Sequence, residues 1–159
     1  MRHALLALVM AALPLQAQAL SCLAPTVERS FARFDAAPEV YIVVHGRLTF
    51  DESALPKGMT VDKDPPAMTH VPATLLGTSL TQDGFSLPFE QDVTLEVSCL
   101  GPWCGSAQTG EDVLAFLRKD EEAYAIAVEP CGGGMFGTPK PDMLDAATAC
   151  MRDRDCTVE

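Results

Sequence analysis

The six cysteines are the residues of this chain whose type and spacing suggest chemistry: Cys22, Cys99, Cys104, Cys131, Cys150 and Cys156. Cysteine thiols bind zinc or exchange disulfides when they form Cys-x-x-Cys pairs or cluster with histidines. No Cys-x-x-Cys pair occurs here, and four residues separate Cys99 from Cys104. An even number of cysteines in an exported chain instead predicts a framework of three disulfide bridges.

The N-terminal residues predict that the chain is exported. Residues 1–19 combine a basic start, a short apolar run and a small-x-small site that ends at Ala19. These features are typical of a signal peptide that is cleaved after Ala19. Cleavage after Ser21 is the alternative and would leave Cys22 as the first residue. We expect a periplasmic or secreted protein without a transmembrane segment, because no later stretch is long and apolar enough to span a bilayer.

The remaining residues, 20–159, have the size of a single domain. The chain contains 22 acidic and 11 basic residues, which gives a formal net charge of −11. Proteins that bind nucleic acids need clustered Lys and Arg to neutralise phosphates. The acidic composition therefore argues against a nucleic-acid partner, and it disfavours anionic membrane surfaces for the same reason.

The remaining reactive side chains do not form a recognisable catalytic set. His45 and His70 are the histidines that follow the predicted signal peptide, and no Gly-x-Ser-x-Gly motif accompanies them. The acidic loop at 51–66 lacks the glycine and the terminal glutamate of a calcium-binding loop. We therefore expect no enzyme activity, no cofactor and no metal site.

Alternating apolar and polar residues predict a mainly β domain. Gly46 and Gly77 lie inside strand patterns and indicate bends, as in the strongly coiled strands of small barrels. Residues 113–117 are apolar on both faces, which is typical of a covered central strand. A short helix is expected over 26–36 and a closing helix over 142–151. The expected strands cover 40–50, 71–81, 85–89, 93–99, 113–117 and 124–128.

Trp103 is a candidate binding residue because it lies in a short loop between two cysteines. Exposed aromatic side chains often contribute much of the binding energy at protein interfaces. The alternative is that Trp103 covers one end of the barrel as part of the fold.

The order of these features resembles the netrin-like and tissue-inhibitor-of-metalloproteinases group over residues 22–151. The resemblance implies a five-stranded OB-type Greek-key barrel, stapled by disulfides, with a short N-terminal helix and a C-terminal helix. The matching features are Cys22 near the mature N-terminus, strand 40–50 with its central glycine, Cys104-Gly105 followed by Gly110 and strand 111–117, a strand that leads to Cys131, and the closing helix.

The same resemblance implies a pattern of bridges. Cys22 would tie the N-terminal segment to the barrel at Cys131, with Cys104 as the alternative partner. Cys99 with Cys104 would close the loop at 100–103, and Cys150 with Cys156 would hold the C-terminal tail.

Inhibitors in this group chelate the zinc of a target protease through the amine and carbonyl of an N-terminal cysteine, and Cys22 is the matching residue. The chain departs from them because cleavage after Ala19 leaves Leu20 and Ser21 ahead of Cys22, and because it lacks their Cys-x-Cys start. We therefore expect a monomeric exported binding module for an unknown protein partner, with Cys22 and Trp103 as candidate contact residues. The alternative is a metalloprotease inhibitor that acts through Cys22, and the second alternative is a structural envelope protein.

The intact mass of the exported protein tests the signal peptide and the bridges together. We expect a mature chain that begins at Leu20 and that gains six alkyl groups only after reduction, because all six cysteines are paired. Six thiols that react without reduction would contradict the disulfide framework. A chain that begins at an unmodified Cys22 would favour the inhibitor, and a lipid on Cys22 would mean a tethered protein.

Overall fold

The computed structural model describes residues 21–59, 63–121, 123–153 and 156, so the predicted signal peptide at 1–19 lies outside the described residues. Helix α1 (Val27–Asp35) precedes the strands, a 3-10 turn η1 (Glu52–Ala54) follows the first strand, and helix α2 (Pro141–Asp153) comes last. The strands are β1 (Val40–Phe50), β2 (Met68–Thr81), β3 (Gly84–Leu100), β4 (Trp103–Cys104), β5 (Asp112–Asp120), β6 (Ala123–Val128) and β7 (Met135–Gly137).

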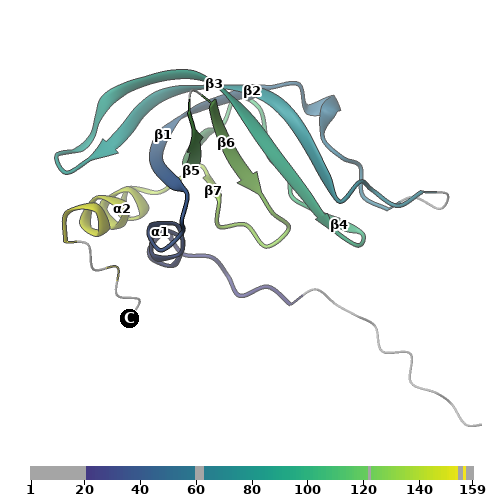
Figure 1. Ribbon diagram of the computed structural model, residues 1–159, viewed down its shortest axis with the longest axis horizontal. Helices are drawn as coiled ribbons and strands as arrows, with labels where there is room; N and C mark the ends of the chain where they lie inside the picture. The colour runs from purple at the N-terminus through teal and green to yellow at the C-terminus, as the bar shows by residue number, and fades with distance from the viewer. Residues whose placement is uncertain (1–20, 60–62, 122, 154–155, 157–159) are drawn as a thin grey trace, which may run out of the picture.

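Five of the strands close into a ring (Figure 1). β1 pairs antiparallel with β2 and with β5, and β2 pairs antiparallel with β3. β3 pairs in parallel with β6, which pairs antiparallel with β5 and completes the ring. The order β1-β2-β3-β6-β5 and back to β1 is that of an OB-type Greek-key barrel. The predicted fold class is therefore confirmed, with β4 and β7 as short additions to β3 and β5.

Strand β5 separates two apolar layers. Inside the ring, Val113, Ala115 and Leu117 join the barrel core. On its outer face, Leu114 and Phe116 pack in a second cluster with residues of α1 and α2. All five side chains are almost completely buried, which confirms the covered strand predicted from the apolar run at 113–117.

Helix α1 lies over the outer face of the barrel. The Thr26 hydroxyl caps it by accepting a hydrogen bond from the backbone N–H of Arg29 at 3.3 Å. Phe34 stacks on Phe116 with 5.0 Å between ring centroids, and Phe31 meets the same ring edge-on at 6.2 Å. The helix therefore covers β5 with aromatic side chains, and its N-terminus stays at one end of the barrel.

The structure corrects the expected separation of two strands. Residues 85–89 and 93–99 belong to one continuous strand, β3. The polar residues 90–92, which lie between the two expected strands, pair in register with residues 74–76 of β2. Cross-strand hydrogen bonding therefore continues through a segment whose side chains face the solvent.

An arginine side chain lies across the alanine-rich face of β6. Arg118 of β5 lies opposite Ala125, and its guanidinium donates two hydrogen bonds to Glu96 of β3, at 2.8 and 2.9 Å. A third hydrogen bond, at 2.9 Å, goes to Asp120. The charged hydrogen bonds to Glu96 and Asp120 raise the pKa of Arg118. The small alanine thus leaves room for an ion-pair brace across the strand.

Gly46 and Gly77 lie opposite each other in the antiparallel pairing of β1 with β2. A Cβ on Gly77 would approach the Cα of Gly46 within 2.5 Å, and a Cβ on Gly46 would approach the Cα of Gly77 within 2.8 Å. The two backbones are therefore closer than any pair of side chains would allow, which explains both glycines of the predicted bends.

Substitution of Gly77 tests this close approach. Gly77→Ala should lower the free energy of unfolding by about 1–3 kcal/mol, because the new methyl group meets backbone atoms of β1. Thr78→Ala, on the neighbouring residue of the same strand, is the control and should change stability by about 1 kcal/mol or less. Urea unfolding under oxidising conditions measures both, and equal losses would contradict the steric explanation.

Candidate functional site

All six cysteines form disulfides in the pairs that the family resemblance implied: Cys22–Cys131, Cys99–Cys104 and Cys150–Cys156. The first joins residues 109 positions apart, with 5.4 Å between their Cα atoms. The alternative bridge from Cys22 to Cys104 is wrong, because Cys104 closes the β3–β4 hairpin with Cys99.

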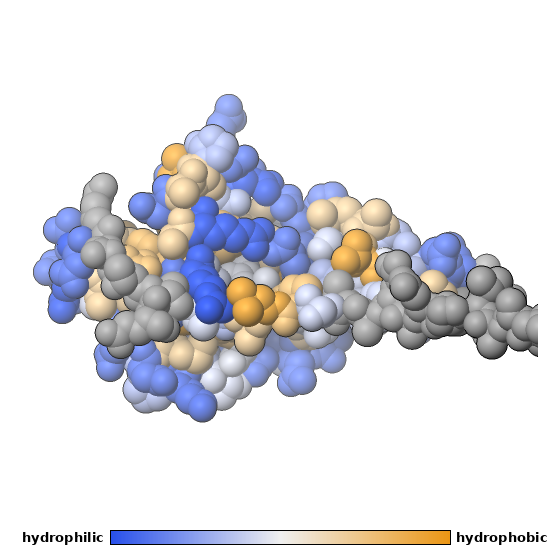
Figure 2. Space-filling view, turned by 90° about the horizontal axis from the view of Figure 1, so that it is seen from below, coloured by the Kyte–Doolittle hydropathy of each residue, from blue (hydrophilic) through white to orange (hydrophobic). Residues whose placement is uncertain are grey.

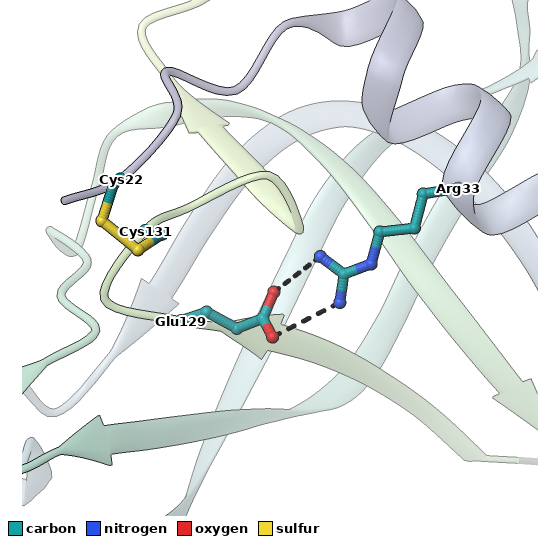
Figure 3. The surroundings of a disulfide bond; sticks show 4 residues. All are labelled: Cys22, Arg33, Glu129 and Cys131. Atoms are coloured by element: carbon teal, nitrogen blue, oxygen red, sulfur yellow. Dashed lines mark hydrogen bonds and ion pairs between the residues drawn. A yellow bond between two sulfur atoms is a disulfide. The ribbon is translucent and has the colours of Figure 1, made fainter. Parts of the chain in front are cut away.

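The Cys22–Cys131 bridge and an ion pair hold the N-terminal segment against the turn that follows β6 (Figure 3). Arg33 of α1 donates hydrogen bonds to both carboxylate oxygens of Glu129, at 2.8 and 3.3 Å. These hydrogen bonds raise the pKa of Arg33. Because both side chains remain partly exposed, the pair contributes at most about 1 kcal/mol to stability. Together with the Cys22–Cys131 bridge, the ion pair fixes the N-terminal segment to this turn at two points.

The glycines of residues 131–134 let that turn approach the N-terminal segment closely. Gly132 and Gly133 have positive φ angles of 71° and 97°. A Cβ on Gly132 would lie 3.3 Å from the ring of Pro25, and one on Gly133 would lie 3.4 Å from the hydroxyl of Ser30. Only glycine adopts this backbone without strain, so the turn, the bridge and α1 form one packed unit.

Trp103 is exposed on a disulfide-closed hairpin. It lies opposite Leu100 in the pairing of β3 with β4, one step beyond the Cys99–Cys104 bridge. The Trp103 side chain is 42% exposed and the Leu100 side chain 59% exposed. Trp103 is a member of neither apolar cluster, which favours a contact residue over a lid on the barrel core.

The two stapled loops border the same hollow. It has a volume of about 420 Å³, and its lining includes Cys99 and Leu100 from the hairpin, Glu129 and Cys131 from the turn after β6, and Arg33 from α1. The turn to which Cys22 is bridged and the hairpin that carries Trp103 therefore lie at the same end of the barrel.

Sequence reasoning missed three apolar residues close to this end, Leu23, Met59 and Met68, all of which are exposed. Leu23 follows Cys22, and Met68 pairs with Ser98 of β3. Met59 follows Gly58, whose Cβ position lies 3.0 Å from the carbonyl oxygen of Pro102 in the hairpin. We call the five residues Leu23, Met59, Met68, Leu100 and Trp103 the stapled end. Figure 2, seen from below Figure 1, shows apolar residues exposed among hydrophilic ones.

The histidines are not brought together. His45 is half-buried on β1, where its ring meets the edge of Phe85 with 5.8 Å between centroids. His70 is exposed on β2. Within residues 21–59, 63–121, 123–153 and 156, no group of three or more His, Cys, Asp or Glu side chains is placed to hold a metal ion. No helix of the described chain is long and apolar enough to cross a membrane.

Comparisons with protein-family models, with curated proteins and with solved structures find no significant match to this chain. Membership of the netrin-like and tissue-inhibitor-of-metalloproteinases group therefore stays a proposal. Inference about function depends on the chain's own residues.

Serine substitutions test how much each bridge at this end stabilises the fold. Cys22→Ser with Cys131→Ser should lower the free energy of unfolding by about 4–5 kcal/mol, because the bridge closes a long loop in the unfolded chain. Cys99→Ser with Cys104→Ser should cost only about 2 kcal/mol, since its loop is short. Chemical denaturation of both variants gives the two values, and the reverse order would count against this account of the staples.

Proposed function

We propose that this protein is an exported, disulfide-stabilised OB-fold module that binds another protein through the stapled end. One observation carries the proposal: Leu100 and Trp103 lie opposite each other, both exposed, on a hairpin closed by a disulfide, and further exposed apolar residues lie on the segments that adjoin it. Monomeric proteins rarely expose clustered apolar surface unless it serves an interaction. Trp103, a residue type enriched among interface hot spots, is the proposed anchor.

The stapled end has the composition that is typical of a protein–protein interface. Leu100 lines a hollow together with the charged residues Arg33 and Glu129, and Trp103 lies opposite Leu100 in the hairpin. Stable protein interfaces combine an apolar centre with a polar rim in the same way. Because the bridges restrict the backbone before binding, little conformational entropy would be lost when a partner docks.

Two further properties support the choice of partner and compartment. The net charge of −11 disfavours nucleic acid and favours a neutral or basic protein surface. Three disulfides with no unpaired cysteine fit an oxidising compartment, so we propose a periplasmic or secreted location. The ring order and the bridge pattern support the proposed membership of the netrin-like group.

A metalloprotease inhibitor is the second candidate. The observation in its favour is that Cys22 is exposed and bridged to a turn that borders the same hollow as the hairpin. By the resemblance, inhibition requires a free amine on Cys22. A chain that begins at Cys22 and one that begins at Leu20 should therefore differ as inhibitors of zinc metalloproteases if this candidate holds, and neither should inhibit if it does not.

Partner binding tests the first candidate with a matched pair of leucines. Leu100 and Leu87 lie on the same strand and are 59% and 58% exposed, but only Leu100 belongs to the stapled end. The immobilised mature protein is used to isolate a partner from the compartment to which it is exported, and affinities are then measured with the purified partner. Trp103→Ala should weaken binding by about tenfold or more, Leu100→Ala should weaken it less, and Leu87→Ala should not change it.

Equal binding by the wild-type protein, Trp103→Ala and Leu100→Ala would show that the stapled end is not the interface. Failure of the wild-type protein to retain any partner would favour the remaining alternative, a structural envelope protein.

A further inference from the structure

A second cavity lies between the helices and the barrel. Its volume is about 250 Å³, and it shares no lining residue with the hollow at the stapled end. The apolar part of its wall includes Phe31 of α1, Val43 of β1, Phe116 of β5 and Met151 of α2. Elements from both ends of the chain therefore bound it.

Aromatic contacts fix the shape of this cavity. Phe34 stands between Phe116 and Tyr41, with ring centroids 5.0 and 4.5 Å away. Phe31 meets Phe116 edge-on. Burial and the charge of Glu39 raise the pKa of Tyr41, and the positive charges of Arg118 and Arg33 offset part of that rise. The walls are thus largely apolar and formed by packed aromatic residues of α1, β1 and β5.

Two carboxylates complete the lining, Asp35 and Glu39, and both residues are exposed, so they lie where the cavity opens to solvent. Among the described residues neither takes part in a salt bridge. Two cations lie beside the wall: the guanidinium of Arg33 is 4.9 Å from the ring centroid of Phe34, and Arg118 acts on Tyr41. Both arginines are bound to other carboxylates, Arg33 to Glu129 and Arg118 to Glu96 and Asp120. Asp35 is also the last residue of α1, where the negative end of the helix dipole makes an anion unfavourable. A positive ligand would relieve this unfavourable arrangement.

We propose that this cavity binds a small organic cation, an ammonium or guanidinium group on an apolar body. The apolar body would pack against Phe31 and Phe116, and the charge would lie near Asp35 and Glu39. An apolar cavity of about 150 Å³ is large enough for a benzene molecule, so this one has room for a ring with a short amine chain. Anionic ligands are disfavoured by the same two carboxylates.

Three probes of similar shape test the role of charge: 2-phenylethylammonium, 2-phenylethanol and 3-phenylpropanoate. Each is titrated into the mature, oxidised protein and followed by backbone amide chemical shifts. The cation should bind about fivefold more tightly than the alcohol, with shifts at the residues of the cavity, and the carboxylate should bind most weakly. Equal affinities for the cation and the alcohol, or no saturable shifts with the cation at millimolar concentration, would overturn the proposal.

A pair of variants separates the cavity from the net charge of the protein. Asp35→Asn with Glu39→Gln should lower the affinity for the cation to that for the alcohol and leave the affinity for the alcohol unchanged. Asp64→Asn with Glu90→Gln removes the same charge at exposed residues outside the cavity and should keep the fivefold preference. Loss of the preference in both variants, or in neither, would contradict a site built on these two carboxylates.

A blocked lysine distinguishes a free ligand from a side chain of another protein. Nα-acetyl-lysine methylamide carries an ammonium group on an aliphatic stem, as a docked polypeptide would. Its flexible stem makes less contact with the aromatic walls than a phenyl ring does, so the cavity should bind it more weakly than 2-phenylethylammonium. Tighter binding of the blocked lysine would overturn the assignment to a free small molecule.

Discussion

The burial of β5 on both faces is the constraint on which the rest of this structure depends. Its inward side chains complete the barrel core, and outward Leu114 and Phe116 must be covered by another layer. Helices α1 and α2 provide that layer, although they come from opposite ends of the chain. Because α1 lies across the barrel, its Arg33 and the preceding Cys22 reach the turn after β6. The stapled end and the cavity beneath the helices therefore both follow from how one strand is covered.

Covalent and ionic links turn this arrangement into a fixed surface. Two bridges end at the loops that border the 420 Å³ hollow, and the Arg33–Glu129 pair adds a third connection. Such links restrict the free protein and so lower the entropy lost on binding. Among the described residues, no disulfide or salt bridge lies next to exposed Leu87, so Leu87 serves as the control for Leu100.

Local patterns predicted much of the fold. The alternation of residues 40–50 predicted both ends of β1 correctly. Gly46 and Gly77 predicted bends where β1 pairs closely with β2, and the apolar run at 113–117 predicted the strand that is buried on both faces. The family resemblance, not spacing, implied the bridges. Missed features depend on distant residues: the pairing that keeps β3 continuous, the hydrogen bonds of Arg118 across β6, and the exposure of Leu23, Met59 and Met68 on segments next to the stapled loops. Patterns within a short stretch of sequence do not predict which loops lie close together once the ring of strands has closed.

The fluorescence of Trp103 tests the central claim, that the stapled end presents a rigid, exposed anchor. Trp103 is the single tryptophan of the chain, so its emission reports this hairpin alone. In the oxidised protein we expect emission typical of a water-exposed indole, ready quenching by acrylamide, and an anisotropy that decays with the tumbling of the whole domain. Blue-shifted emission protected from quenching would mean a buried lid, and fast local rotation would mean an unanchored loop; either result would contradict the account.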